Sequence, residues 1–514
     1  MNLISKLKSK IEDDYYTQVP YEIINKEQLD KRKKVTVIVP VYNAFDYLEK
    51  TVDSVIVQTL GFENITLILV DDGSSDGSRH LMRKFSKLYP NIVSVFLKQN
   101  TGTPAFPRNL GAHLAKSKYA MFLDADDWLS HDGIQVLYEL MEKTKVNYAV
   151  GKSIQVDSKK KSIIGRYESS QDREGVSPFS IKHLFYHLGP RARMMKLDVL
   201  KKNKIRYPEM KYAEDKQFFI DVLLKSPEIS TTTEPVYYLN RMDGNDSLTK
   251  QTDVMEKMDS NIKVLKYVLD KKLPPSEEKM IVNRLIEFDS ITRLFDRKHF
   301  LKSADKQMYY DKFQEVIDVF EGYNRPYRIE DHLIKPISKV IYTLFMEDKY
   351  LELEQLIDWS KNEKNKEPQI IKSRPYHKVN VDDDKQITVP IPFVIESSNV
   401  EVIENEIKLK LKVTGHKIPS FERVKLQHRK HIEEVEVVAL KVEEEEPGVM
   451  EISMKIGDFQ SVTKAGYIFY LMYEDYEQTL VPIRMEEDLV IPLQSNKELI
   501  IYSTVKDHVG LKIK

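Results

Sequence analysis

The first part of the chain alternates short apolar runs with longer segments in which apolar residues recur at helical spacing. Four runs rich in β-branched and aromatic residues are typical of strands buried on both faces: residues 35–39, 65–70, 93–97 and 119–123. The intervening segments have the periodicity of helices, at residues 46–60, 77–89 and 107–117. This alternation predicts an α/β domain built on a parallel sheet.

The pattern changes twice farther along the chain. Between residues 253 and 363, apolar residues such as Ile262, Leu265 and Leu269 recur at helical spacing, which predicts a helical linker domain. A polar stretch with two prolines, residues 361–385, separates it from a region of apolar and polar alternation. That alternation predicts an antiparallel β module resembling a sandwich, in which the acidic run at 443–446 is expected to be a solvated turn.

The length of 514 residues exceeds what one hydrophobic core usually supports, so several domains are expected. The patterns place their boundaries as follows: an N-terminal helical extension at 1–34, the α/β domain at 35–250, the helical linker domain at 251–370 and the C-terminal β-rich module at 371–514.

The N-terminal extension has an amphipathic start. Leu3, Ile4, Leu7 and Ile11 share one helical face, with lysines elsewhere, so this helix could rest on an anionic membrane surface or pack on its own α/β domain. The second reading is favoured because so short a lysine cluster is attracted only weakly to a membrane. No apolar run reaches the ~18 residues needed to cross a bilayer, so we expect a cytoplasmic protein with at most peripheral membrane association.

The composition limits the classes of partner and of metal site that the chain can have. The 79 lysines and arginines nearly cancel the 80 acidic residues, so the chain lacks the basic field that attracts nucleic acid, and no nucleic acid is expected as a partner. The absence of cysteine excludes disulfides, thiolate metal sites and thiol nucleophiles. Oxygen and imidazole ligands remain, which favours a hard cation for any metal.

Polar clusters follow the ends of the predicted strands. Pro40 and Tyr42 close the first strand, residues 71–76 close the second, and Asp124 and Asp126 follow the fourth. Ligands of open α/β sheets bind outside the carboxyl ends of the strands, so one crevice could collect all these clusters. Residues 71–76 are also expected to form a turn with a helix cap.

The Asp124 and Asp126 pair suits metal chemistry. Alternate carboxylates at a strand end can hold Mg²⁺ or Mn²⁺ against a diphosphate, and such an ion neutralises the charge of a leaving nucleoside diphosphate. Taken alone the pair is a weak signal, because acidic pairs are often helix caps or exposed turns.

Three motifs in order make the signal specific: P-x-Y-N at 40–43, D-D-x-S-x-D at 71–76 and D-x-D-D at 124–127. In this order and at about this spacing they resemble glycosyltransferase family 2, the inverting enzymes of the GT-A fold. The resemblance implies a Rossmann-like nucleotide-sugar-binding domain, a UDP-sugar donor and a Mn²⁺ or Mg²⁺ cofactor.

The resemblance also implies roles for single residues in donor binding. Pro40, Tyr42 and Asp72 would border the uracil and ribose, and Asp124 with Asp126 would serve the ribose and the metal-bound diphosphate, with Asp126 as the metal ligand. Asn100 and Arg108 resemble the segment that reaches the nucleotide. A guanidinium suits phosphate or uracil oxygens, although a surface salt bridge is the alternative for Arg108.

Residues 212–216 resemble the family's E-D motif. An inverting displacement needs a carboxylate to take the acceptor's proton, and the resemblance assigns that role to Asp215 with Glu214 in support; the dipeptide could equally begin a helix. Farther on, Arg241 and Ser247 lie in a segment similar to the one that covers the donor diphosphate. No histidine in residues 239–250 offers itself as a further metal ligand.

Residues 102–109, residues 207–215 and the β-rich tail resemble wall teichoic acid glycosyltransferases, which add N-acetylglucosamine to polyribitol phosphate. This implies transfer of a sugar from UDP-N-acetylglucosamine to an anionic polyol-phosphate polymer. Two alternatives stay open: a capsule or other teichoic acid glycosyltransferase using UDP-glucose or UDP-N-acetylgalactosamine, and a non-catalytic polymer-binding scaffold. In the similar enzymes the β modules aid polymer binding and oligomerisation, so a homo-oligomer formed through the tail is a further expectation.

Overall fold

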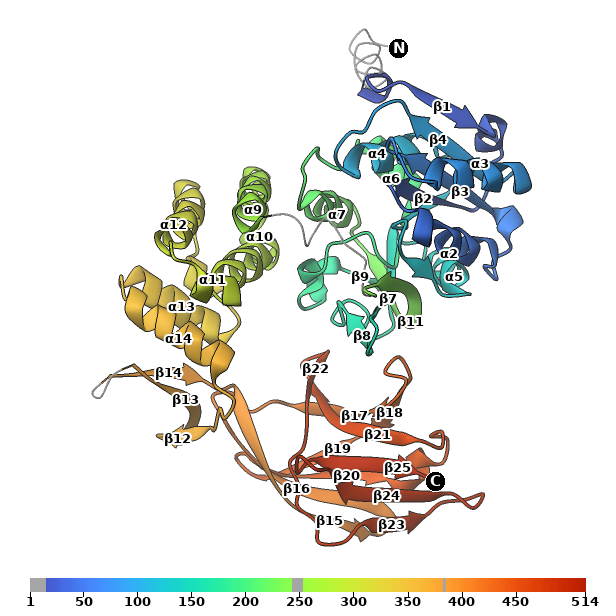
Figure 1. The fold of residues 1–514 in the computed structure, drawn as a ribbon. Coiled ribbons are helices and arrows are strands. Elements are labelled where there is room, and N and C mark those ends of the chain that lie inside the picture. Colours follow the sequence, from blue (N-terminus) through green and yellow to red (C-terminus); the bar gives the residue numbers. More distant parts are fainter. Residues whose placement is uncertain (1–14, 243–252, 382–384) are drawn as a thin grey trace. The chain divides into compact units, whose positions relative to one another are not determined.

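The computed structural model describes residues 15–242, 253–381 and 385–514, and it divides the chain into two compact units, 1–271 and 272–514 (Figure 1). The predicted amphipathic helix at residues 3–11 and the candidate Ser247 lie outside the described residues. The division into four segments with the boundaries given above stays a prediction.

The centre of the first unit is the predicted parallel sheet. β2 (Val35–Val41) pairs in parallel with β3 (Ile65–Asp71) and with β5 (Tyr119–Phe122), and β3 pairs in parallel with β4 (Ile92–Leu97). Every residue of β3 and β4 is buried, as the continuous apolar runs predict for strands covered on both faces. The predicted α/β fold of this domain is confirmed.

Three helices connect these strands: α2 (Phe45–Ile56), α3 (Ser78–Leu88) and α4 (Ala105–Leu114). Their apolar faces pack on the sheet in one core, to which Leu48, Val52 and Met82 belong. Gly111 lets α4 approach the sheet closely, because a Cβ there would lie 2.4 Å from Cγ2 of Ile38. The close approach places the residues of α4 beside the strand ends.

Strands of mixed direction extend the sheet on the far side of β5. β10 (Arg193–Lys196) pairs with β5 and with β7 (Tyr148–Val156), and β11 (Ile229–Asn240) lies between β7 and β6 (Trp128–Leu129). Two short strands join the margin: β8 (Lys161–Ile164) pairs with β7, and β9 (Arg173–Val176) pairs with β11. The unit also contains α5 (Gly133–Thr144), α6 (Leu197–Lys202), α7 (Glu214–Leu224) and α9 (Val254–Asp270).

At the other edge, β1 (Tyr21–Ile24) pairs antiparallel with β4. A helical extension was predicted at residues 1–34, so this strand is a difference from the prediction. Its partner lies about 70 residues away, so the pairing is a long-range contact without a local signal.

The second unit begins with the predicted helices: α10 (Pro275–Asn283), a π-helix (Arg284–Thr292), α11 (Lys298–Lys302), α12 (Gln307–Gly322), α13 (Pro336–Met346) and α14 (Tyr350–Asn362). A three-stranded sheet follows, made of β12 (Gln369–Ile371), β13 (Arg374–Asn380) and β14 (Gln386–Pro390). The polar stretch at 361–385 was expected only to separate domains, but it supplies β12 and β13.

The rest of this unit is antiparallel, as predicted. One sheet has the order β15-β16-β20-β19, from β15 (Phe393–Ile403), β16 (Glu406–Gly415), β20 (Val449–Lys455) and β19 (Lys441–Glu446). The other runs β18-β17-β21-β25-β24-β23, with β22 (Glu477–Thr479) on β21; its strands are β18 (Val435–Ala439), β17 (Phe421–His428), β21 (Gly466–Tyr473), β25 (Val509–Ile513), β24 (Glu498–Ser503) and β23 (Leu489–Pro492). A single core takes side chains from both sheets, among them Leu409, Ile452 and Leu471.

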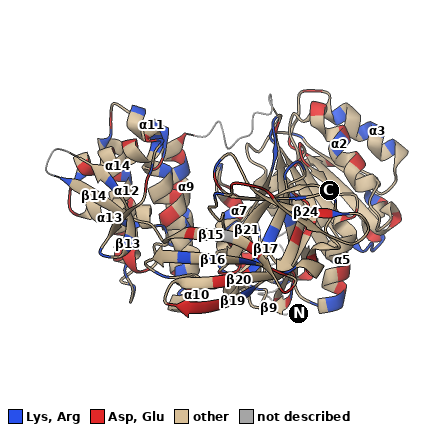
Figure 2. Ribbon diagram, turned by 90° about the horizontal axis from the view of Figure 1, so that it is seen from below, with Lys and Arg blue, Asp and Glu red and all other residues tan. Residues whose placement is uncertain are grey.

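The prediction of a turn at residues 443–446 is wrong. These glutamates belong to β19, an exposed edge strand that is red in Figure 2. Charged side chains on an edge strand discourage pairing with another chain, so the acidic run suits this place. Among the described residues, no helix is long and apolar enough to cross a membrane.

Candidate active site

The loops that follow β2, β3 and β5 meet at one edge of the sheet. Val41 is in register with Asp71, so β2 and β3 end level, and β5 ends at Phe122, in register with Ile38 of β2. The amide of Asp72 donates to the carbonyl of Val41 at 2.8 Å, which joins the first two loops directly. The motifs at 40–43, 71–76 and 124–127 therefore begin at neighbouring points of this edge.

The first two loops are tied together by side chains. The amide of Asn43 donates to Oγ of Ser74 at 3.0 Å, and Oδ1 of Asn43 accepts from the amide of Ser75 at 2.9 Å. The carboxylate of Asp76 accepts from the amides of Phe45 and Ser78, at the starts of α2 and α3. The expected cap is present, and it serves both helices.

Two of the candidate donor-binding residues are open to solvent at this edge. Tyr42 is 55% exposed and Pro40 is half-buried. A nucleoside could reach their side chains without a rearrangement of the core. Both positions agree with the expectation that these residues border a ligand, although their role stays a prediction.

Asp71 and Asp72 have different environments. Asp71 is fully buried, pairs with Nε of Arg79 at 2.7 Å and holds the loop in shape. Asp72 accepts from the amide and from Oγ1 of Thr101, each at 2.9 Å, and burial raises the pKa of its carboxyl. Asp72 thus links the loop to the segment after β4 that carries Asn100.

The turn at Gly73 brings these two segments into contact. Its φ of +74° favours glycine, and a Cβ there would lie 2.9 Å from the amide nitrogen of Asn100. The side chain of Asn100 is exposed, and its Oδ1 accepts from the amide of Gly102. The segment that carries Asn100 therefore lies against the loop of Asp72, and the nucleotide-binding role of Asn100 stays a prediction.

Arg108 is the centre of the site. It is only 5% exposed, its Nη2 lies 2.7 Å from Oδ1 of Asp124, and its Nη1 lies 3.1 Å from Oε1 of Glu214. The alternative of a surface salt bridge is therefore wrong for this residue. The guanidinium joins the D-x-D motif to the E-D motif, with one terminal nitrogen on each carboxylate, and the role of Arg108 in nucleotide binding stays a prediction.

The E-D motif lies at the first turn of a helix. α7 begins at Glu214, after Ala213 in a left-handed conformation with φ of +69°, so the sharp turn before the helix directs the motif into the site. Burial raises the pKa of the Glu214 carboxyl, and the neighbouring charge of Asp215 raises it further. The pair therefore combines a buried carboxyl with the half-buried carboxylate of Asp215.

Tyr207, for which no role was predicted, packs against the guanidinium of Arg108 and the ring of Phe218. Its backbone is held by Asn109, which accepts from the Tyr207 amide at 2.8 Å and donates to its carbonyl at 2.9 Å. Its ring stacks on Phe218 of α7 at 3.9 Å, and the guanidinium of Arg108 lies 5.1 Å from its centroid. Among the described residues its buried hydroxyl has no hydrogen-bond partner.

Asp127 and Tyr237 form a second connection that was missed. The Tyr237 hydroxyl donates to Oδ2 of Asp127 at 2.7 Å and accepts from the amide of Asp124 at 3.2 Å. Oδ1 of Asp127 accepts from the amide of Asn240 at 2.7 Å. The position of Asp127 as the last residue of D-x-D-D was the signal that could have identified it, and its effect is to fix the D-x-D loop against β11.

The remaining candidates lie at the rim. Asp126 is half-buried, two residues after Asp124. Arg241 follows β11, where its amide donates to the carbonyl of Val156 at 2.8 Å and its Nη1 donates to the carbonyl of Asn240. Within residues 15–242, 253–381 and 385–514, no three acidic or histidine side chains gather as a metal cluster. The metal role of Asp126 and the diphosphate role of Arg241 stay predictions.

Comparison with known proteins agrees with this geometry. Residues 36–203 match the family described as Glycosyl transferase family 2. Over 211 residues the chain is 33% identical to the poly(ribitol-phosphate) beta-N-acetylglucosaminyltransferase TarP of Staphylococcus aureus, a match that covers 40% of this chain and 62% of that protein. Over 213 residues it is 30% identical to a poly(ribitol-phosphate) beta-glucosyltransferase of Bacillus spizizenii, covering 41% of this chain and 33% of that protein. Both matches span less than two thirds of the relative.

The likeness extends to solved structures. The crystal structure of S. aureus TarS superimposes with a TM-score of 0.56 at 16% identity, over 94% of this chain and 85% of that one. A shorter TarS structure, residues 1–349 with UDP-GlcNAc, gives a TM-score of 0.55 at 18% identity, over 69% of this chain and 99% of that one. At such identity the likeness concerns the fold. The family match at residues 36–203, the shared fold and the three motifs at one sheet edge agree with one another, so this part of the chain is similar to glycosyl transferase family 2.

Proposed function

We propose that this protein is an inverting glycosyltransferase that moves a sugar from a UDP donor to a hydroxyl of a polyol-phosphate polymer. The observation that carries the proposal is the buried Arg108, whose guanidinium joins Asp124 to Glu214. That arrangement holds the carboxylates expected to serve the donor next to the carboxylate expected to act as the base. The names of the relatives support the polymer class.

Asp215 is assigned as the general base. The acceptor oxygen forms a bond to the anomeric carbon while the bond from that carbon to the diphosphate oxygen breaks, and the acceptor proton passes to Asp215. Attack opposite the leaving group inverts the anomeric centre. Glu214, whose pKa is raised by burial and by Asp215, is held by Arg108 and orients its neighbour.

The donor is assigned to the loops at the sheet edge. Pro40, Tyr42 and Asp72 would border the uracil and ribose, with Asn100 beside them. Asp124 would serve the ribose, while Arg241 and Ser247 would cover the diphosphate. Arg108 acts in this proposal through Asp124 and Glu214, because its terminal nitrogens already bind them.

A divalent cation fits the residues present. Mg²⁺ is commonly held by one or two carboxylates together with substrate phosphates, so Asp126 and a donor diphosphate need no third carboxylate. Mn²⁺ accepts the same oxygen ligands. The ion would neutralise the charge that develops on the departing nucleoside diphosphate.

The donor sugar is proposed to be N-acetylglucosamine. The relative from S. aureus is named for this sugar, and the shorter TarS structure contains UDP-GlcNAc. Glucose is the second candidate, because the relative from Bacillus spizizenii is a beta-glucosyltransferase. The C-terminal β module is proposed to bind polymer or to join copies of the chain.

A non-catalytic scaffold is the remaining alternative. A buried arginine between two carboxylates carries a desolvation penalty, which a polymer-binding module has no need to bear. Intact carboxylates at Asp124, Asp126 and Asp215 also favour a catalyst over a scaffold.

A donor screen tests the proposal. Full-length protein is incubated with UDP-N-acetylglucosamine, UDP-glucose or UDP-N-acetylgalactosamine, with and without polyribitol phosphate, and released UDP is measured. We expect release that depends on the polymer and is fastest with UDP-N-acetylglucosamine. No polymer-dependent release with any donor, in protein that melts cooperatively, would leave the scaffold as the better description.

A further inference from the structure

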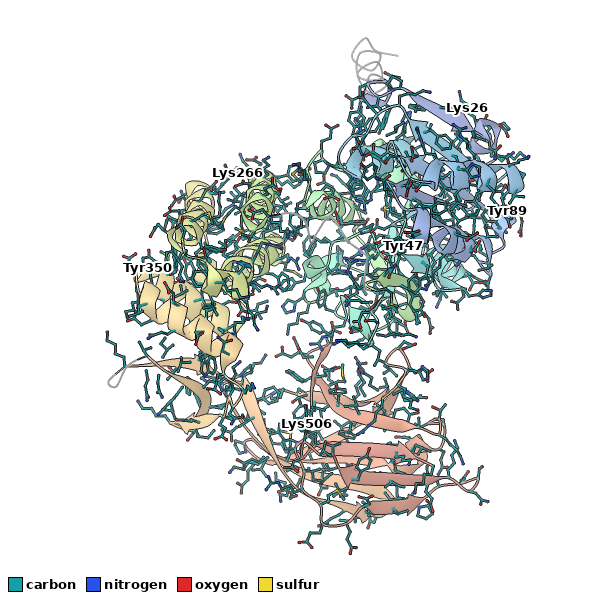
Figure 3. All side chains as sticks on the ribbon, in the orientation of Figure 1. Lys26, Tyr47, Tyr89, Lys266, Tyr350 and Lys506 are labelled. Atoms are coloured by element: carbon teal, nitrogen blue, oxygen red, sulfur yellow. The ribbon has the colours of Figure 1, made fainter. Side chains whose placement is uncertain are left out.

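The helix that carries the E-D motif, α7, is attached to α9, on which Lys266 is labelled in Figure 3. In the first turn of α7, Nζ of Lys216 donates to Oδ1 of Asn261 at 2.6 Å. Farther along α7, Oδ1 of Asp221 lies 2.7 Å from Nζ of Lys271, the residue that follows α9. The two helices therefore contact each other at two separate places along α7.

The contact of Lys216 is buried in an unfavourable setting. Lys216 is only 9% exposed and Asn261 is 2% exposed, although lysine is among the residues least often buried. Lys216 also lies at the start of a helix, where the positive end of the helix dipole disfavours an ammonium group. Departures from such local preferences are expected mainly at functional sites, so the position of Lys216 indicates a role besides stabilising the fold.

Three successive residues of α7 have different surroundings. Residues of an α-helix point about 100° apart, so residues 214 and 216 point to nearly opposite sides and residue 215 points between them. Glu214 is buried and held by Arg108, and Lys216 is buried and held by Asn261. Asp215, between them, is only half-buried. The two buried contacts fix the rotation of the helix about its axis, and with it the direction of the Asp215 carboxylate.

Tyr212, just before α7, adds to the contact with α9. The ammonium of Lys216 lies 5.1 Å from the centroid of the Tyr212 ring, and the ammonium of Lys257 on α9 lies 5.8 Å from the same centroid. Both distances are within the range of cation–π attraction. The ring therefore links the start of α7 to α9 beside the bond between Lys216 and Asn261.

We propose that Lys216 is a positioning residue, which holds the first turn of α7 through Asn261 so that Asp215 faces the acceptor hydroxyl. The inference rests on the proposed function, in which Asp215 is the general base. Lys216 itself takes no proton and touches no substrate. Because a displacement of a reacting group by about 1 Å can lower a rate by about 10²-fold, loss of the contact should be visible in kcat.

Kinetics of variants that break the contact from either side test this role. Lys216→Met keeps the length of the side chain and removes the donor, whereas Asn261→Leu keeps the size and removes the acceptor. In the full chain, each should lower kcat for polymer-dependent UDP release by about 10–100-fold and leave KM for the donor unchanged. The double variant should be no slower than the slower single variant, because both substitutions break one contact. The pH profile of kcat should keep its shape in all three.

The matched control is Lys271→Met, which removes the lysine that pairs with Asp221. It loosens the same two helices away from the first turn of α7, so kcat should stay within about threefold of wild type. Melting curves measure how far each variant is destabilised. If Lys271→Met loses as much kcat as Lys216→Met, loosening of the helices explains the effect and the positioning role is wrong.

Hydrogen exchange tests the contact without turnover. In an α-helix the amides of residues 218–220 donate to the carbonyls of residues 214–216, so their exchange reports opening of the first turn. These amides should exchange about tenfold faster in Lys216→Met and in Asn261→Leu than in wild type. In Lys271→Met their exchange should be unchanged.

The inference is overturned if Lys216→Met or Asn261→Leu retains the kcat or the amide exchange of wild type, or if their losses of kcat multiply in the double variant. It is also overturned if Lys216→Met alone shifts the pH profile of kcat, because the charge of Lys216 would then act on Asp215 directly. Turnover of the wild type that both variants retain would reject this inference and keep the proposed function. Absence of polymer-dependent UDP release from the wild type would reject the proposed function, and amide exchange would still decide whether Lys216 holds the first turn.

Discussion

Replacing Arg108 should reveal how the site is held together. In an Arg108→Met variant an apolar side chain of similar length leaves Asp124 and Glu214 without their shared cation. Asp124 is 29% exposed in its side chain and can be solvated, whereas Glu214 is 9% exposed in its side chain and cannot. The main loss is therefore a buried carboxylate without a partner.

The size of the effect follows from this burial. Removing one partner of a buried ion pair destabilises a protein by about 3–5 kcal/mol. For a domain of the size of the first unit, that corresponds to a fall in melting temperature of roughly 6–20 °C. The matched control is Lys202→Met, which removes an exposed pair with Asp198 at 3.0 Å and should cost about 0–1 kcal/mol.

The pH dependence identifies Glu214 as the cause. In the folded wild type the pKa of Glu214 is already raised, and loss of Arg108 raises it further. When a carboxyl has a higher pKa in the folded state than in the unfolded state, the free energy of unfolding of the protein falls as pH rises between those two pKa values. The variant should therefore be least stable at high pH, and the difference in stability between variant and wild type should shrink as pH falls toward the ordinary pKa of glutamate.

Thermal melting of the full chain at several pH values between 5 and 9 measures this difference in stability. The proteins compared are the wild type, Arg108→Met and an Arg108→Met, Glu214→Gln double variant. The double variant should regain part of the lost stability and lose the added pH dependence, because it has no buried charge to neutralise. A loss below about 1 kcal/mol for Arg108→Met at high pH, or a pH profile parallel to wild type, would show that Arg108 does not hold Glu214 in the way described.

Three further outcomes are expected. Asp215→Asn should lower kcat by about 10²–10⁴ with UDP affinity unchanged, and a variant that retains more than about a tenth of wild-type kcat would remove Asp215 from the mechanism. Asp126→Ala should abolish UDP release while the chain stays folded, and full turnover of the wild type in excess chelator would contradict the metal role. Tyr207→Phe deletes a buried hydroxyl that has no partner among the described residues, so the melting temperature of this variant should equal or exceed that of wild type. The control Tyr467→Phe loses a hydrogen bond to Thr463 and should be destabilised by about 0.5–1.5 kcal/mol. If Tyr207→Phe is destabilised as much as Tyr467→Phe, the Tyr207 hydroxyl has a partner after all.

The sequence by itself determined the elements around the sheet and the order of the motifs. The runs at 35–39, 65–70, 93–97 and 119–123 are strands because short, mostly apolar runs suit strands buried on both faces, and that signal is local. The helices between them follow from periodicity in the same way. Since parallel strands end at one edge, the meeting of the three loops was also predictable.

Local signals failed where a strand depends on its pairing partner more than on its own composition, whether that partner is about 70 residues away, as for β1, or adjacent in the chain, as for β12, β13 and β19. β1 is only four residues long and pairs with β4, and β12 and β13 lie in a stretch whose polar composition is typical of a linker. The glutamates of β19 form a strand because β20 provides their hydrogen bonds, although their composition favours a turn. Pairing energy from another segment outweighs propensity in each case.

Only the tertiary structure decided what the charged residues do. Arg108 lies 106 residues from Glu214 in the chain, and Asp127 lies 110 residues from Tyr237, so no spacing within a motif could assign either contact. From the sequence alone, an arginine is equally suited to bind a phosphate, a surface carboxylate or a buried carboxylate. Burial by segments that are distant in sequence selects among these, because removing water makes the nearest carboxylates the necessary partners of the guanidinium.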